Sequence, residues 1–81
     1  MKLFYKPQAV KQIKKLPVKE RVKVIRKLEK LTQDPLAGKP LKGELEGLRS
    51  LRAWPYRIVY KLEKKEIIIF SVAHRQGIYK A

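Results

Sequence analysis

The chain has 81 residues, no cysteine, one histidine and a formal net charge of +14, with 21 lysines and arginines against seven aspartates and glutamates. This length predicts a single domain, residues 1–81, with a small core and no deep enclosed active site, and the lack of cysteine excludes a disulfide framework and thiolate metal sites. No apolar run approaches the roughly 18 residues of a membrane span, so we expect a soluble cytoplasmic protein. Its basic charge favours a polyanionic partner. Nucleic acid is the leading candidate, and an acidic protein or a membrane surface are the alternatives.

The first half of the chain predicts one short strand and two helices. Residues 2–5 alternate as a strand, and Pro7 suits the first turn of a helix, where its missing N–H costs nothing. Pro17 separates this amphipathic helix from a second, longer one that ends at Asp34-Pro35, and we expect the two to form a hairpin. The predicted apolar stripes are Ala9, Ile13 and Leu16 in the first helix, and Val18, Val22, Ile25, Leu28 or Glu29, and Thr32 in the second, widened by Val24 and Leu31.

The second half predicts a loop and three strands. Residues 35–47 hold two prolines and three glycines and predict a loop that returns the chain to the sheet. The strand candidates are residues 48–53, 56–62 and 67–73, joined by a turn at Trp54-Pro55 and by a polar hairpin turn. The last run is apolar and rich in β-branched residues, which is typical of a central strand. The element order predicts an α+β fold, a small antiparallel-rich sheet with an N-terminal helix hairpin packed on one face.

Alternation along residues 56–62 predicts that most of the apolar side chains of this strand face the core and that Arg57 faces the opposite way. Tyr56, Ile58, Tyr60 and Leu62 fall on one face of this strand, and Arg57 falls on the other. A hairpin that returns beside this strand would bring the end of the chain near Arg57. The candidate chemical cluster is therefore Arg57, His74, Arg75 and Tyr79, with Arg52 close in sequence.

These residue types fit chemistry on phosphate. The guanidinium fork of arginine binds phosphate oxygens bidentately and can stabilise charge that develops at phosphorus. Tyrosine can exchange a proton or stack on a base, and histidine titrates near neutral pH. The sequence has no Gly-rich phosphate loop, HExxH motif or nucleophile elbow, so we expect no metal and no cofactor. Each residue also has a structural interpretation: Arg57 and Arg75 as solubilising charges, Trp54, Tyr56 and Tyr60 as packing residues, Tyr79 as a C-terminal anchor, and His74 as a structural or merely exposed histidine.

Several segments carry a resemblance to a known family: Pro40-Leu41-Lys42-Gly43 with Gly47 and Leu51-Arg52, then Tyr56-Arg57-Ile58-Val59-Tyr60, then His74-Arg75 with Tyr79. With the helix pair and the Asp34-Pro35 break, they make nearly the whole chain similar to the RelE/ParE superfamily of type II toxin–antitoxin toxins. In its RelE-like branch this resemblance implies a ribosome-dependent mRNA endonuclease. Arg57, Arg75 and Tyr79 match positions that carry catalysis in that branch.

The resemblance also implies a mechanism and partners. The 2′-hydroxyl of RNA would attack the adjacent phosphate without a metal, with Arg57 stabilising the phosphorane, Arg75 holding the phosphate or assisting the leaving oxygen, and Tyr79 or His74 handling a proton. Leu48 and Ser50 stand where some members carry lysines. The implied partners are mRNA on the ribosome and a cognate antitoxin, in a hetero-oligomer that binds operator DNA through the antitoxin. The alternatives are a ParE-like inhibitor of DNA gyrase and a non-catalytic basic RNA-binding module. The residues expected to bind RNA are Arg49, Arg52, Lys42 and Lys61.

Overall fold

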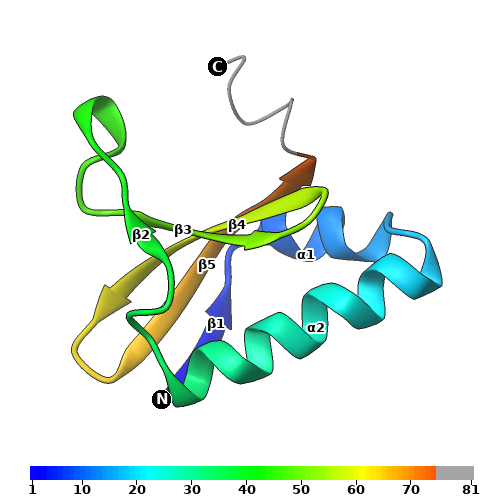
Figure 1. Ribbon diagram of the computed structural model, residues 1–81, viewed down its shortest axis with the longest axis horizontal. Coiled ribbons are helices and arrows are strands. Elements are labelled where there is room, and N and C mark those ends of the chain that lie inside the picture. The colour runs from blue at the N-terminus through cyan, green and yellow to red at the C-terminus, as the bar shows by residue number, and fades with distance from the viewer. Residues whose placement is uncertain (75–81) are drawn as a thin grey trace.

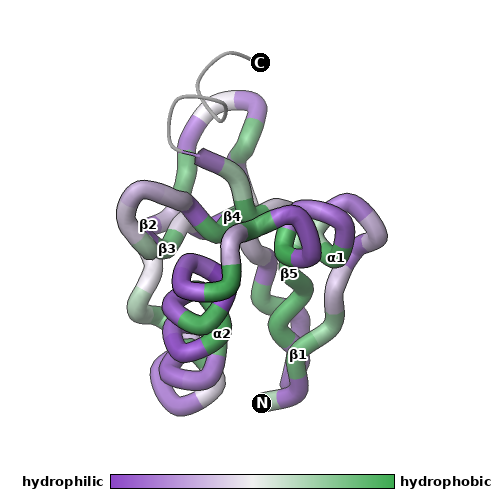
Figure 2. The backbone as a smooth tube through the Cα atoms, turned by 90° about the vertical axis from the view of Figure 1, so that its right-hand side faces the viewer, coloured by the Kyte–Doolittle hydropathy of each residue, from purple (hydrophilic) through white to green (hydrophobic). Residues whose placement is uncertain are grey.

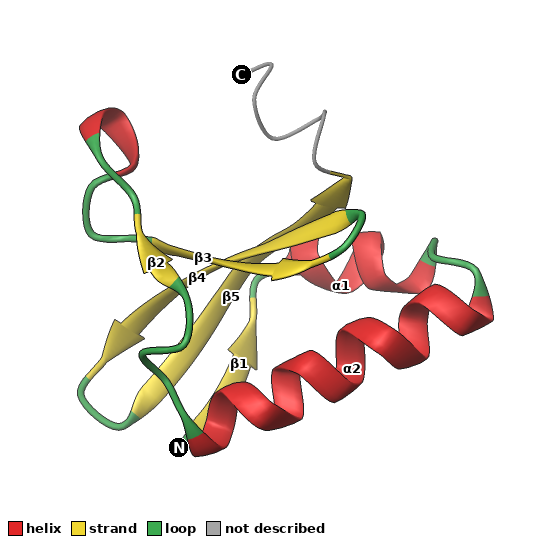
Figure 3. Ribbon diagram, in the orientation of Figure 1, coloured by secondary structure: helices red, strands yellow, loops and turns green. Residues whose placement is uncertain are grey.

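A computed structural model describes residues 1–74 and confirms the α+β architecture (Figures 1 and 3). Two helices lie on one side of a sheet, and the other face of the sheet carries no helix in the part of the chain that is described. The elements are β1 Lys2–Tyr5, α1 Pro7–Lys14, α2 Val18–Gln33, β2 Lys39–Pro40, a 3₁₀ turn Gly43–Leu45, β3 Arg49–Ala53, β4 Tyr56–Glu63 and β5 Glu66–His74.

The sheet has the order β1-β5-β4-β3-β2 within the described residues. β1 is parallel to β5, and the other three pairs are antiparallel, as the predicted antiparallel-rich sheet requires. β4 and β5 are therefore interior strands, which explains why their core face is almost wholly apolar. The buried core contains Ala9 and Leu16, Val24, Leu28 and Leu31 of α2, and Ala53, Ile58, Tyr60, Ile67, Ile69 and Val72 of the sheet.

Only part of the predicted apolar stripe of α2, namely Leu28 with the widening residues Val24 and Leu31, packs on the sheet. Val24, Leu28 and Leu31 are at most 1% exposed, whereas the leading residues of the predicted stripe, Val18 and Val22, are 69% and 44% exposed. α2 alternates hydrophobic and hydrophilic residues along its length (Figure 2), and both sets have helical spacing. Because the sequence offers two apolar stripes, only the packing against the sheet decides which one is buried.

A β-bulge in β5 joins two registers of the central hairpin. Val59 lies opposite Ser71, but Tyr60 lies opposite Ile69, so Phe70 is the extra residue. Because the bulge adds one residue to β5, Ile69 and Val72 both face the core although they are three positions apart. The side-chain amide oxygen of Gln12 on α1 accepts a hydrogen bond of 2.7 Å from the Val72 backbone N–H, which satisfies a donor close to the bulge.

The segment predicted as a plain loop is more ordered than expected. β2 pairs Lys39 with Ser50 and Pro40 with Arg49, and its proline fits an edge strand because it has no N–H to donate. The loop is also tied to the core by Tyr60, whose hydroxyl donates to the Pro35 carbonyl at 2.8 Å and accepts from the Gly38 N–H at 3.0 Å. Local sequence patterns could not predict these contacts, because they join residues more than 20 positions apart.

Two further features complete the fold. The turn between β3 and β4 consists of Trp54 and Pro55, joined by a cis peptide bond. Within residues 1–74, neither helix is both long and apolar enough to cross a membrane.

Candidate nucleic-acid interface

The face of the sheet opposite the helices carries a cross-strand arginine pair. Arg52 of β3 lies directly opposite Arg57 of β4, while their neighbours Ala53 and Ile58 point into the core. Arg52 is exposed and Arg57 half-buried. Like charges directly opposite each other destabilise a ladder, and a phosphate between two guanidinium groups is stabilising for the same electrostatic reason. The predicted position of Arg57 on the face away from the core is confirmed.

A groove of about 600 Å³ runs beside this arginine pair. β2 pairs with only the first two residues of β3, so the edge of β3 from Leu51 onward is not covered by β2. Four of the side chains that line the groove are cations, and none of its described lining residues is acidic, so it suits a polyanion. The lining residues are Lys27, Ala37, Lys39, Pro40, Leu41, Ser50, Leu51, Arg52 and Arg57.

Arg49, which the sequence assigns to RNA binding, makes structural contacts. Its guanidinium donates to the Gly38 carbonyl at 2.6 Å and to the Leu36 carbonyl at 3.2 Å. Together with the Tyr60 hydroxyl, it holds the loop that forms one wall of the groove. RNA binding by Arg49 stays a prediction. Its observed hydrogen bonds fix the loop that forms one wall of the groove.

The two predicted RNA-binding lysines lie further out. Lys42 is exposed and immediately precedes the 3₁₀ turn. Lys61 follows Arg57 by four positions along β4, and its Nζ lies 3.0 Å from a Glu63 carboxylate oxygen. Both side chains of this ion pair are more than 40% exposed. Such a pair contributes only about 0.2–1 kcal/mol and is screened by salt, so Lys61 can exchange its carboxylate for a phosphate.

Of the four candidate catalytic residues, the structure describes Arg57 and His74. His74 lies opposite Tyr56 at the end of the β4–β5 ladder, with ring centroids 5.8 Å apart in an edge-to-face arrangement. Arg57 lies opposite Ala73, so the ladder places Arg57 and His74 one position apart and on alternate faces. Arg75 and Tyr79 lie outside the described residues, so their predicted roles stay predictions.

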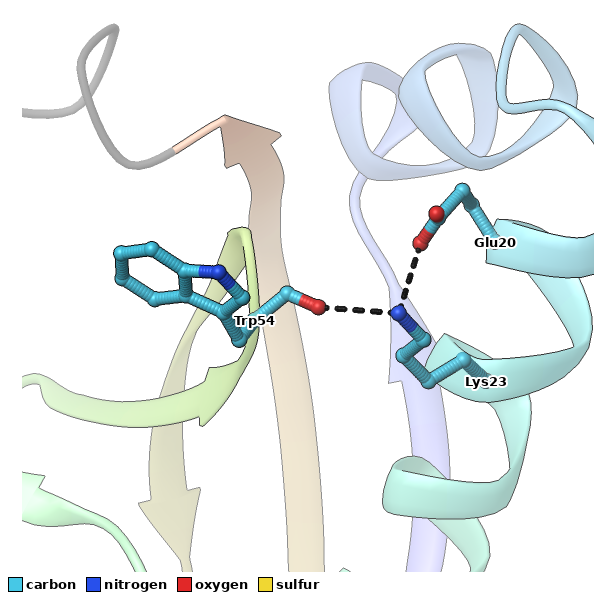
Figure 4. Close-up of polar contacts among 3 residues, drawn as sticks. All are labelled: Glu20, Lys23 and Trp54. Atoms are coloured by element: carbon cyan, nitrogen blue, oxygen red, sulfur yellow. Dashed lines mark hydrogen bonds and ion pairs between the residues drawn. The ribbon is translucent and has the colours of Figure 1, made fainter.

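Trp54 is a candidate that the sequence interpretation missed. Expected to pack, it is instead 55% exposed at the tip of the β3–β4 hairpin. Its backbone carbonyl accepts a hydrogen bond of 3.1 Å from Lys23 of α2, and Lys23 also lies 3.0 Å from the Glu20 carboxylate. The indole points away from α2 (Figure 4). Its place in the short turn between two predicted strands was the sequence signal that could have indicated an exposed ring.

An apolar groove of about 280 Å³ lies on the helical side of the molecule. Tyr5 of β1, Val10 and Ile13 of α1, and Ile25 of α2 line it together with Lys14. Burial raises the pKa of the Tyr5 phenol above its ordinary value. Val22 and Val18, which are exposed at helical spacing from Ile25, extend the apolar surface along α2, and contiguous exposed apolar residues are typical of protein-binding surfaces.

The described residues hold no preformed ligand set for a metal. Within residues 1–74, no three His, Cys, Asp or Glu side chains lie close enough together to bind a metal ion.

These features define a class of protein, a small basic α+β domain with a helix pair on one face of its sheet and a cationic groove along the edge of β3, from Lys27 of α2 to the arginine pair on the opposite face. Residues 3–79 match the family model described as the ParE toxin of the type II toxin–antitoxin system parDE. The chain therefore belongs to the RelE/ParE superfamily of type II toxin–antitoxin toxins.

Individual relatives agree with this assignment. The chain is 40% identical over 53 residues to toxin RelG of Mycobacterium tuberculosis, an aligned stretch that spans 62% of this chain and 61% of RelG. It superimposes on a chain of the M. tuberculosis toxin–antitoxin complex RelBE2 with a TM-score of 0.84 and 31% identity, covering 91% of this chain and 96% of that one. A chain of the intact Escherichia coli RelBE toxin–antitoxin complex gives a TM-score of 0.76 and 26% identity, with 90% and 94% covered.

Proposed function

We propose that this toxin is an endoribonuclease that cleaves mRNA on the ribosome. The observation that carries the proposal is the Arg52–Arg57 pair beside the cationic groove, on the face that the helices leave open. This arrangement offers two planar donor groups to adjacent phosphates of one RNA strand. The similarity to RelG and to the RelBE complexes favours the RelE-like branch over others in the superfamily.

The proposed reaction is an internal transesterification. The RNA 2′-oxygen forms a bond to the adjacent phosphorus, and the bond from phosphorus to the 5′-oxygen breaks. The products are a 2′,3′-cyclic phosphate, or the 3′-phosphate formed when water opens it, and a 5′-hydroxyl. Arg57 neutralises the negative charge that builds up on the phosphoryl oxygens, so the step needs no metal. Tyr79 takes the proton from the 2′-hydroxyl, and His74 is the second choice for this step because the ladder turns it to the face alternate to Arg57. Arg75 holds the phosphate or assists the leaving 5′-oxygen, which takes up a proton to become the 5′-hydroxyl.

Ribosome dependence follows from the shape of the site. The groove is an open surface feature of a chain of 81 residues, and it does not enclose a substrate. A flexible RNA in such a groove rarely adopts the in-line geometry that attack requires. Correct positioning can supply roughly 7 kcal/mol or more of the barrier, and an mRNA held in the decoding site is already fixed. We therefore expect free RNA to be cleaved poorly.

The expected protein partner is a cognate antitoxin. The apolar surface formed by Tyr5, Val10 and Ile25 with Val18 and Val22 is flanked by lysines and arginines of both helices. This surface fits an amphipathic segment with apolar residues at its centre and acidic residues at its rim. RelBE2 and RelBE are both described as toxin–antitoxin complexes, which supports a partner of this kind. Operator DNA would then be bound through the antitoxin.

A second candidate is inhibition of DNA gyrase without cleavage of RNA. It is favoured by the match of residues 3–79 to a family model named for ParE. The same basic face would then serve as a binding surface, and Arg57 would make no contact with a reacting phosphate.

One experiment separates the two candidates. Purified protein is added to programmed ribosomes and, in parallel, to gyrase with supercoiled DNA, and RNA ends are mapped by primer extension. The proposal predicts codon-phased cuts in ribosome-bound mRNA that disappear with Arg57→Ala. Gyrase–DNA breaks in the presence of intact mRNA would instead establish the second candidate.

A further inference from the structure

The indole of Trp54 is an exposed aromatic surface next to cationic groups. Trp54 is 55% exposed, although burying its ring would remove more apolar area from water than burying almost any other side chain. Arg52 is the exposed residue of β3 two positions before Trp54, and β3 ends at Ala53, which is buried in the core. Trp54 follows directly in the turn, and its indole points away from α2 (Figure 4), as Arg52 does on the opposite face of the sheet from the helices.

The turn that carries Trp54 is fixed to the rest of the molecule. Lys23 of α2 donates to the Trp54 carbonyl and is itself held by Glu20 (Figure 4). On the other side of the turn, Ala53 pairs with Tyr56 in the β3–β4 ladder. The backbone below the indole therefore has contacts on both sides, and the ring is presented on a supported hairpin rather than on a loose loop.

We propose that Trp54 is a stacking platform for an unpaired nucleobase of the RNA whose phosphates bind at Arg52 and Arg57. Proteins that hold single-stranded nucleic acid combine a cationic groove for the backbone with aromatic side chains for the bases, and every base has a π-face that can stack. The flat indole of Trp54, two residues from the groove-lining Arg52, supplies the second part of this arrangement. This inference rests on the proposed function, because it assumes that the groove holds RNA.

The positions of the side chains favour a nucleobase over an apolar protein segment. The nearest positions along β3 and β4 on the same face, Arg52 and Arg57, are cationic. The exposed apolar residues Val18, Val22 and Ile25 belong instead to α2, on the other side of the sheet. An exposed aromatic ring beside cations offers little apolar area to a protein partner, whereas its exposed part suits stacking by a base whose phosphates bind those cations.

The inference can be tested by fluorescence, because Trp54 is the one tryptophan in the chain. The intact protein is titrated at low salt with an all-2′-O-methyl RNA of about 12 nucleotides, which has no free 2′-hydroxyl to attack. An oligonucleotide of the same length and charge with abasic residues serves as the matched ligand. Binding of each is followed separately by anisotropy of an end-labelled copy.

We expect both oligonucleotides to bind through their phosphates and only the one with bases to quench Trp54. Equal quenching by both, or binding of the base-containing RNA without quenching, would overturn the stacking role and leave RNA binding intact. If neither oligonucleotide binds, the failure lies with the proposed function itself, and the stacking inference falls with it.

Variants provide a second readout that does not depend on fluorescence. Trp54→Leu should weaken binding of the base-containing oligonucleotide about tenfold and leave the abasic one unchanged, whereas Trp54→Phe should retain most of the affinity. Leu36→Ala, at a loop position that is 66% exposed, is the matched control and should bind as the parent does. Circular dichroism confirms that each variant is folded. Unchanged RNA affinity in Trp54→Leu, or loss of antitoxin binding in its place, would contradict the inference.

Discussion

Tyr60→Phe tests how the core supports the groove, because it removes one oxygen atom and keeps the ring. The Tyr60 side chain is fully buried, and its hydroxyl makes two hydrogen bonds, to the Pro35 carbonyl and from the Gly38 N–H. Each bond contributes about 1 kcal/mol, and leaving the Gly38 N–H buried without a partner costs a further 1 kcal/mol or more. The expected loss is about 2–4 kcal/mol, against a total of roughly 4–12 kcal/mol for a chain of this size.

The assay is urea unfolding followed by far-UV circular dichroism. Tyr56→Phe is the matched control, because Tyr56 lies on the same face of β4 and its hydroxyl makes no hydrogen bond among the described residues. Tyr60→Phe should also weaken binding of RNA in the groove, since the loop that it releases carries Ala37, Lys39 and Pro40. A loss of stability below about 0.5 kcal/mol, equal to that of Tyr56→Phe, would refute the claim that Tyr60 holds the loop.

Three further predictions concern charge, partner and pH. Lys19 and Lys30 lie on the exposed face of α2, and replacing either with alanine should reduce the slope of log affinity for the ribosome against log salt concentration by about one. The cleavage rate of the ribosome-bound toxin should not change. An unchanged slope would show that α2 is not part of the surface that binds the ribosome. Ile25→Asp should weaken the antitoxin complex by about 2 kcal/mol, measured by isothermal titration calorimetry, and should spare RNA cleavage. Because burial raises the pKa of Tyr5 above that of the unfolded chain, the associated stability is fully present below about pH 10 and is lost as the pH rises through the folded value. In Tyr5→Phe, the free energy of unfolding should therefore fall less steeply above about pH 10. The same fall in the variant and the parent would show that Tyr5 does not contribute to it.

Much of the fold could be predicted from local patterns. The boundaries of both helices follow from Pro7, Pro17 and Asp34-Pro35, and the central hairpin follows from alternation along β4. The residues that α2 buries lay within the predicted apolar stripe, but the sequence did not show which part of it packs on the sheet, because Val18 and Val24 both begin sets with helical spacing and tertiary packing selects one. The same holds for β2 and the bulge at Phe70, which depend on pairing between distant segments.

The candidate site was predictable where it depends on alternation and on the turn between β3 and β4. Alternation placed Arg57 on the face opposite the core, as observed. The register that sets Arg52 opposite Arg57 is fixed by the two-residue turn at Trp54 and Pro55, which agrees with the predicted turn between residues 48–53 and 56–62. The structural contacts of Arg49 were hidden because a charged side chain on a strand is equally consistent with solvent, phosphate or a carbonyl.

The central claim is that Arg57 stabilises the transition state of RNA cleavage, and the single-turnover cleavage rate on programmed ribosomes tests it most directly. With toxin at saturating concentration, Arg57→Ala should cut mRNA about 100-fold more slowly or worse, while its ribosome affinity and antitoxin affinity remain close to those of the parent. Arg26→Ala is the matched control, since it removes the same charge from the exposed surface of α2, and it should cut at nearly the parental rate. An Arg57→Ala rate within about threefold of the parent, or an equal loss in Arg26→Ala, would contradict the account.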